Sequence, residues 1–217
     1  MSDSAIWTRN GITDTRLVRS FAYVGGKWVG GDEAATIAVT NPADGSVLGA
    51  VASLSADQAR KAVDAAQGAF DGWAMTLPQD RAALLRRWFD LILAHREDLA
   101  RIMVLEQGKP LSEARGEIDY AASFVEYYAE EAKRPNIEGV TSHLPDAEVE
   151  LWLEPVGVAA LITPWNFPAA MLTRKAAAAL AAGCSVVSHP SAETPYSALA
   201  LAELAERAGI PAGVFNV

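Results

Sequence analysis

Apolar and polar positions in the first part of the chain alternate and then recur at helical spacing. Residues 21–29 form two short β-prone runs on either side of a Gly-Gly pair, which is typical of a β-hairpin. Residues 38–52 repeat the order of strand, turn and strand. Successive helices are then expected to begin near Ser55, Pro78, Glu97 and Leu111, because apolar residues lie three or four positions apart. The expected apolar face of the first helix consists of Ala59, Val63, Ala66 and Phe70.

The period changes after a predicted loop at residues 134–147. Residues 148–163 first alternate and then become almost wholly apolar, as buried strands do, and the alanine-rich helix after them ends at Gly183. A second apolar strand follows, and Thr194 and Pro195 suit an N-cap and a first helical position. With a last strand near residue 214, the order β-α-β-α-β predicts an α/β fold whose parallel sheet has right-handed crossovers.

The ends of the chain differ in their patterns. Residues 1–16 are polar and are expected to form a flexible N-terminus. The other end of the sequence lies inside an apolar strand, and an unpaired apolar strand favours aggregation. We therefore expect these residues to be the first part of a longer protein.

Composition and charge narrow the classes of function. The 217 residues are 51% hydrophobic and 21% charged with a formal net charge of −9, which is typical of a globular protein with an acidic surface. A nucleic-acid partner needs a basic face and a membrane span needs about 20 apolar residues, so neither partner is expected. No metal site is expected, because the 3 histidines are scattered. The single cysteine and the absence of a signal-peptide pattern favour the cytoplasm.

Several stretches resemble the aldehyde dehydrogenase superfamily. They are TPWNFP at residues 163–168, RKAAAALAAGC at 174–184 and the run at 189–217 that begins HPSAETP. A further stretch, VLEQGKPLSEARGEIDYAASFVEYYAEEAKR, is similar to the succinate-semialdehyde (glutarate-semialdehyde) dehydrogenase branch. The resemblance covers residues 17–217.

The resemblance implies an incomplete aldehyde dehydrogenase fold with a helical N-terminal segment and the start of a Rossmann-like parallel sheet. Residues 17–138 would form the hairpins and helices of the cofactor-binding domain, and residues 156–217 its first βαβαβ unit. Residues 139–155 resemble an oligomerisation strand, which implies dimers or tetramers of the complete protein. The catalytic domain would lie beyond residue 217.

Two polar residues receive roles from the resemblance. Asn166 matches an asparagine whose amide donates to the oxygen of the hemithioacetal formed from the aldehyde, where negative charge grows during the reaction. Arg174 matches an arginine that holds the distal carboxylate of a semialdehyde, and a guanidinium pairs with a carboxylate through two hydrogen bonds. By residue type alone, Asn166 also suits a Pro-bounded turn and Arg174 an ordinary helix surface.

Residues after two of the predicted strands match the cofactor segment of the family. They are Thr163, Pro164, Trp165, Asn166, His189, Pro190, Ser191 and Ala192. His189 stands where the family usually has a lysine, and a histidine is shorter and mostly neutral at pH 7. We therefore expect weakened cofactor binding that improves as the pH falls towards about 6. Ala192 stands where a glutamate would repel the 2′-phosphate of NADP, so the cofactor is expected to be NADP or NAD.

The nucleophile of the family has no counterpart in this sequence. Cys184 begins an apolar strand, so its thiol is expected to be buried and inert. In the family the nucleophilic cysteine and the general-base glutamate lie further along the chain than residue 217. The complete enzyme would oxidise a semialdehyde, with succinate semialdehyde the first candidate, through thiolate attack, hydride transfer to NAD(P) and hydrolysis of the thioester. The 217 residues alone are expected to be inactive.

A second hypothesis is that the 217 residues are a degenerate, non-catalytic module that binds nucleotide weakly or only pairs with other subunits. His189 and the missing nucleophile favour it, and the intact TPWNFP stretch does not decide between the two. Coding DNA beyond Val217 distinguishes them, because an open frame with a Gly-Gln-Cys-like stretch supports the enzyme and a stop codon supports the module. A dehydrogenase of another nicotinamide fold is disfavoured, because the sequence has no GxGxxG fingerprint.

Overall fold

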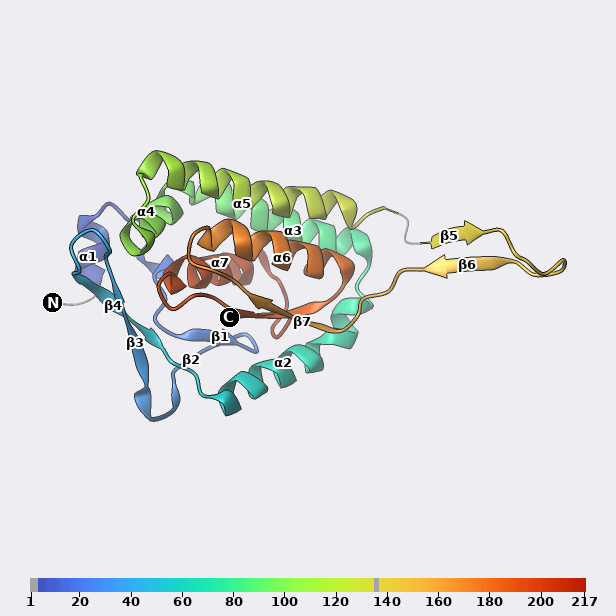
Figure 1. Ribbon diagram of the computed structural model, residues 1–217, viewed down its shortest axis with the longest axis horizontal. Coiled ribbons are helices and arrows are strands. Elements are labelled where there is room, and N and C mark those ends of the chain that lie inside the picture. The colour runs from blue at the N-terminus through green and yellow to red at the C-terminus, as the bar shows by residue number, and fades with distance from the viewer. Residues whose placement is uncertain (1–3, 135–136) are drawn as a thin grey trace.

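A three-stranded parallel sheet lies at the centre of the computed structural model, which describes residues 4–134 and 137–217. The strand order is β7-β8-β9, and α6 and α7 are the crossovers (Figure 1). The bounds are β7 Val158–Ile162, α6 Pro168–Ala182, β8 Ser185–His189, α7 Pro195–Ala208 and β9 Phe215–Asn216. The predicted α/β class and the β-α-β-α-β order are confirmed.

Helices from the first part of the chain lie on both sides of this sheet: α2 packs directly on one face, and the others pack on the crossover helices that cover the other face. They are α2 Ala56–Ala74, α3 Pro78–Ala94, α4 Arg96–Gln107 and α5 Leu111–Glu131. In Figure 1, α3 and α5 lie beside α6 and α7, whereas α2 lies on the other side of the sheet. Buried indoles join the layers, since Trp73 Nε1 donates to Leu180 O at 3.2 Å and Trp88 Nε1 donates to Leu201 O at 3.1 Å. A buried Trp that also satisfies its N–H contributes both apolar area and orientation to the core.

The first long helix, α2, packs through small side chains. Its predicted capping box is confirmed, with Ser55 and Gln58 bonded to each other's backbone N–H groups. The predicted apolar face is partly wrong, because Ala62, Ala66 and Trp73 are buried while Val63 is 46% exposed. Alanines occur on several sides of this helix, so the periodicity of its sequence alone does not identify the packed side. The packed side is the one where small side chains let the helix backbone come close to the sheet.

Two antiparallel hairpins precede the helices, as the turn residues predict. They are β1 Ala22–Val24 with β2 Lys27–Val29, and β3 Thr36–Thr40 with β4 Val47–Ala52. Gly25 and Gly26 have φ values of 60° and 78°, which side chains with a Cβ rarely adopt. Tyr23 and Val217 donate an N–H to each other's carbonyl at 2.9 Å, so β1 lies against the chain just after β9.

A third antiparallel hairpin projects from the body of the molecule (Figure 1). It consists of β5 Ile137–Val140 and β6 Val149–Trp152, and both strands are exposed along their whole length. The interpretation of residues 134–147 as a loop is therefore wrong for β5, whose four residues, Ile-Glu-Gly-Val, do not alternate. Pairing with β6 defines this strand, with Ile137 opposite Trp152. Pro135 and Asn136 of the expected loop lie outside the described residues.

Single residues of the N-terminal segment lie in the core, such as Ile12 at 2% exposure, which differs from the flexible N-terminus predicted for residues 1–16. Helix α1, Ser4–Arg9, places Trp7 edge-on against Tyr196 with 4.8 Å between ring centroids. Asp98 accepts hydrogen bonds from the backbone N and Oγ1 of Thr13, both at 2.9 Å. Single apolar residues in a polar stretch give no periodic signal, so their burial could not be predicted. Residues 1–3 lie outside the described residues.

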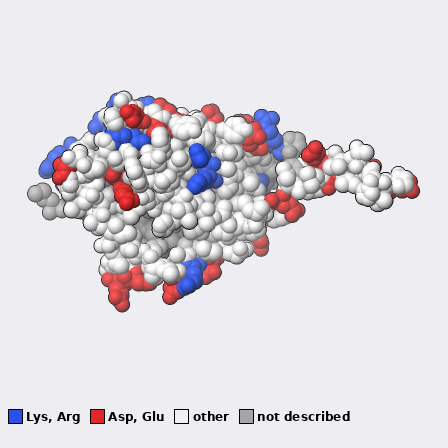
Figure 2. All heavy atoms as spheres, in the orientation of Figure 1, with Lys and Arg blue, Asp and Glu red and all other residues white. Residues whose placement is uncertain are grey.

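The surface carries both signs of charge. On the face in Figure 2, Lys and Arg lie among Asp, Glu and uncharged residues. Within residues 4–134 and 137–217, no helix has the length and apolarity that crossing a membrane requires. Nor do these residues bring together three or more His, Cys, Asp or Glu side chains that could hold a metal ion.

The N-terminus of α7 is capped by a residue that is distant in sequence. Thr194 occupies the predicted N-cap position, but its side chain makes no capping hydrogen bond. Instead, the buried Glu106 of α4 accepts from the backbone N of Tyr196 and of Ser197, both at 2.7 Å. A carboxylate at a helix N-terminus satisfies free N–H groups and complements the helix dipole.

Glu106 is expected to make the stability of the fold depend on pH. Burial raises the pKa of its carboxyl to about 8, while hydrogen bonds from Ser197 and Tyr196 oppose this rise. The unfolded chain releases this proton at about pH 4.3, the usual pKa of a Glu carboxyl. The folded state therefore retains a proton that the unfolded chain has already lost. The stabilising contribution is complete below that pH and is lost as the pH rises through about 8. Urea denaturation at a series of pH values measures this loss. As the pH rises to about 8, the free energy of unfolding should fall less for Glu106→Gln than for the unaltered protein.

The amide of Glu106→Gln does not titrate, and its NH₂ faces a backbone donor. We expect this variant to lose about 1–3 kcal/mol of stability at pH 5. Glu126→Gln is the matched control, because in the part of the chain that the structure describes its side chain makes only an exposed ion pair with Arg86 at 2.9 Å. That control should change stability by less than about 1 kcal/mol. An equal pH dependence in Glu106→Gln and the unaltered protein would contradict the prediction.

Candidate functional site

Strands β7 and β8 end side by side at one edge of the sheet. Ile162 pairs with His189, and the backbone N of Thr163 donates to His189 O at 3.2 Å. In open parallel sheets, ligands bind beyond the carboxyl ends of the strands. The two segments that the sequence singles out, 163–167 and 189–192, therefore lie next to each other.

The segment after β7 presents polar and aromatic side chains to the surface. Thr163 is buried, whereas Pro164, Trp165, Asn166 and Phe167 are exposed. The carbonyl oxygen of Asn166 accepts a hydrogen bond from Lys109 Nζ at 3.1 Å. Its carboxamide makes no hydrogen bond within the described parts of the chain, so both amide donors are available to a ligand.

The turn after β8 carries the exposed imidazole of His189 and the exposed carboxylate of Glu193. His189 and Ala192 are exposed, and Pro190 and Ser191 are half-buried. Ser191 Oγ donates to the carboxylate of Glu193, which lowers the pKa of that carboxyl. Glu193 lies one residue beyond Ala192, so its charge bears on the choice of cofactor that Ala192 suggests.

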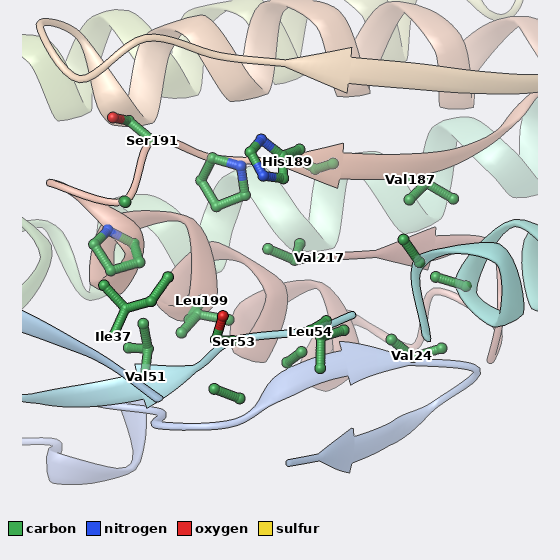
Figure 3. A pocket seen from close by; sticks show the side chains of 18 residues that line it. Val24, Ile37, Val51, Ser53, Leu54, Val187, His189, Ser191, Leu199 and Val217 are labelled. Carbon is green, nitrogen blue, oxygen red and sulfur yellow. The ribbon is translucent and has the colours of Figure 1, made fainter. Parts of the chain in front are cut away.

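A cavity of about 250 Å³ lies beside this turn. In Figure 3, His189 and Ser191 lie on one side of the cavity and Ser53 and Leu54 on the other. Most of its lining is apolar, but the lining residue Ser188 has a buried hydroxyl without a partner in the described structure. A buried hydroxyl without a partner gains a hydrogen bond when a polar ligand group reaches it. Sequence reasoning missed this cavity, because segments far apart in sequence line it.

Neither crossover helix offers a free N-terminus to a phosphate. Glu117 of α5 accepts from the backbone N of Ala169 at 3.0 Å and of Ala170 at 3.3 Å, at the start of α6. Glu106 occupies the start of α7 in the same way. A phosphate at either helix start would therefore meet a buried carboxyl group that already occupies the N–H donors. The residues present fit the sugar of a dinucleotide better than its phosphates, in agreement with the absent GxGxxG fingerprint.

Two cationic residues lie on α6. Lys175 Nζ donates to Ile162 O at 2.7 Å and so fastens α6 to the end of β7. The neighbouring Arg174 is exposed, and its guanidinium forms no ion pair with any residue in 4–134 or 137–217. Arg174 can therefore bind an external anion without losing an internal partner.

The thiol of Cys184 has no access to this site. Cys184 is 4% exposed and lies just before β8, at the far end of the strand from His189. Its expected burial is confirmed. Cys184 is therefore not placed to act as a nucleophile on a ligand at these strand ends.

The chain is similar to known proteins of one family. The model of the aldehyde dehydrogenase family matches residues 28–217. An aspartate-semialdehyde dehydrogenase (non-phosphorylating) of Halomonas elongata is 58% identical over 208 residues, which is 96% of this chain and 42% of that protein. The glutarate-semialdehyde dehydrogenase of Pseudomonas aeruginosa is 54% identical over 206 residues, covering 95% and 43% of the two chains. The NADP-dependent succinate-semialdehyde dehydrogenase of Escherichia coli is 53% identical with the same coverage.

Solved structures agree with the sequence relatives. An NADP-dependent enzyme of E. coli superposes with a TM-score of 0.94 at 53% identity, over 95% of this chain and 43% of that one. Betaine aldehyde dehydrogenase of Staphylococcus aureus in complex with NAD⁺ has a TM-score of 0.92 at 33% identity, over 97% and 42%. The chain thus spans less than half the length of the proteins that it matches.

Proposed function

Because this chain belongs to the aldehyde dehydrogenase family, we propose that it supplies part of the active site of an NAD(P)-dependent semialdehyde dehydrogenase. The observation that carries the proposal is the pairing of Thr163 with His189, which brings the Asn166 segment beside the turn at 189–192. Relatives that are 53–58% identical are named for aspartate, glutarate and succinate semialdehydes. Succinate semialdehyde is the substrate that we propose first.

Two side chains of this chain would act on the substrate. The carboxamide of Asn166 would donate to the aldehyde oxygen as negative charge develops on it, which lowers the barrier because the donor is already in place. The guanidinium of Arg174, which has no ion pair in the described structure, would bind the distal carboxylate. A semialdehyde whose aldehyde oxygen meets Asn166 and whose carboxylate meets Arg174 would be oriented as well as bound.

The cofactor would lie across the two strand ends. Pro164, Trp165 and the turn at 189–192 would contact its sugar and nicotinamide portions, and NAD(P) would supply the hydride acceptor when bound. Ala192 leaves room for a 2′-phosphate, whereas the nearby Glu193 carboxylate opposes one. The choice between NADP and NAD would then depend on how far Ser191 holds that carboxylate away.

His189→Lys in the full-length protein is expected to tighten cofactor binding about tenfold. A lysine at the end of β8 carries a permanent charge on a longer stem, and about 1.4 kcal/mol of added interaction corresponds to that factor. Isothermal titration with NAD and with NADP measures the two Kd values. Gln67→Lys is the control, because it adds the same positive charge at an exposed position of α2. An unchanged Kd for both cofactors in His189→Lys would sink this proposal.

We propose a role in assembly for the hairpin of β5 and β6. Exposed apolar side chains on it include Ile137, Val140, Leu151 and Trp152. Such a surface favours contact with another subunit, so the complete protein would form dimers or tetramers through residues 139–155. In this proposal, residues 17–138 and 156–217 form the cofactor-binding domain of a cytoplasmic enzyme.

A further inference from the structure

The two oxygens of the Glu117 carboxylate bind different parts of the structure. Oε1 accepts from the backbone N of Ala169 at 3.0 Å and of Ala170 at 3.3 Å, at the start of α6. Oε2 forms an ion pair with Lys109 Nζ. The side chain of Glu117 is 1% exposed and that of Lys109 is 9% exposed, so water screens this pair little.

The ammonium of Lys109 also contacts the segment that carries Asn166. Its Nζ donates to the carbonyl oxygen of Asn166 at 3.1 Å and lies 4.4 Å from the ring centroid of Phe167. The backbone beneath it is fixed, because Lys109 N donates to Gln107 Oε1 at 3.0 Å and Gly108 adopts a φ of 86°. The ammonium is thus held by a carboxylate, a carbonyl and an aromatic face.

These contacts fix the main chain at the carbonyl of Asn166 and in the turn just after it. Lys109 holds the carbonyl of Asn166 itself, and Glu117 holds the amides three and four residues later. A rotation of the peptide after Asn166 would move its carboxamide away from the substrate oxygen. Displacements of about 1 Å from a productive geometry can cost a factor of about 100 in rate.

We infer that Lys109 and Glu117 are positioning residues that hold the Asn166 carboxamide in place for the reacting aldehyde. The inference rests on the proposed function, because it assumes that Asn166 contacts the substrate. Neither residue needs to touch the substrate itself. Their effect should therefore pass entirely through Asn166, which separates positioning from a general contribution to folding.

The test compares Lys109→Met, Glu117→Gln and Asn166→Ala in the full-length protein. We expect each of the first two to lower kcat about 10- to 100-fold, with the cofactor Kd changed by less than about twofold. The double variant Lys109→Met/Asn166→Ala should be no slower than Asn166→Ala alone, since the position of a missing carboxamide has no effect. Lys133→Met is the control and should leave kcat unchanged, because among the described residues the Lys133 side chain makes only an exposed ion pair with Glu130.

Amide hydrogen exchange over residues 166–170 gives a second readout that needs no turnover. Exchange there should be at least about tenfold faster in Lys109→Met than in the unaltered protein, because local opening controls exchange. Additive losses in the double variant, or unchanged exchange at these amides, would overturn the inference. If Lys109→Met does not fold, Lys109→Arg and Glu117→Gln decide by the same readouts. If the unaltered protein oxidises no semialdehyde, the proposed function fails while exchange alone still decides the positioning of residues 166–170.

Discussion

Asn166→Ala in the full-length protein is expected to lower kcat for a semialdehyde about 100- to 1,000-fold. Removal of one fixed donor to a developing oxyanion costs about 3–4 kcal/mol in transition-state stabilisation. The carboxamide of Asn166 suits this role, because it is exposed at the end of β7 while its carbonyl is held by Lys109. Steady-state kinetics with saturating cofactor measures the loss, which should appear in kcat more than in KM.

Two further variants sharpen the result for Asn166. Asn166→Asp should be at least as slow as Asn166→Ala, since a carboxylate repels the negative charge that the amide stabilises. Asn10→Ala is the control, because Asn10 is exposed near α1 and, within residues 4–134 and 137–217, its side-chain amide donates only to Ile6 O at 2.9 Å. A kcat within about threefold of the unaltered protein for Asn166→Ala would remove Asn166 from the catalytic machinery.

Arg174→Met is expected to raise the KM for succinate semialdehyde roughly 30- to 150-fold. Loss of a charged hydrogen-bonded pair with the distal carboxylate corresponds to about 2–3 kcal/mol. Butanal, which has a methyl group in place of the carboxylate, should show nearly the same KM in the variant and the unaltered protein. Arg174→Lys should be intermediate, because an ammonium cannot form the two parallel hydrogen bonds of a guanidinium.

The comparison of the two aldehydes is the internal control for Arg174. A general distortion of α6 would affect both substrates, whereas loss of a carboxylate contact affects only succinate semialdehyde. Arg60→Met on the exposed side of α2 controls for the change in net charge. Equal effects on succinate semialdehyde and butanal would exclude Arg174 as the carboxylate anchor.

The parts of the fold that follow from local pattern could be predicted from the sequence. The order β-α-β-α-β follows from a change in hydrophobic period, and the first hairpin follows from Gly25 and Gly26. The packed face of α2 could not be predicted, because alanines on several sides make the helix nearly symmetric in hydrophobicity. Strand β5 could not be predicted either, since it is defined by its pairing with β6 rather than by its own residues.

The candidate site depended on resemblance more than on periodicity. TPWNFP identifies the Asn166 segment, but no spacing in the sequence shows that Thr163 bonds to His189. The capping of α6 and α7 by Glu117 and Glu106 could not be predicted from the sequence, because each carboxyl group and its N–H partners are at least 52 residues apart. Lys109 was overlooked for the same reason, since its bond to Asn166 O spans 57 residues.

Turnover of succinate semialdehyde by the full-length protein, followed through the absorbance of the reduced cofactor, decides whether this chain serves an enzyme. The test uses NAD and NADP separately, with aspartate and glutarate semialdehydes as further substrates. We predict that succinate semialdehyde is converted to the acid with at least one cofactor, and that Asn166→Ala abolishes most of this turnover. Binding of NAD or NADP without oxidation of any of the three semialdehydes would contradict the proposed function and favour a non-catalytic module.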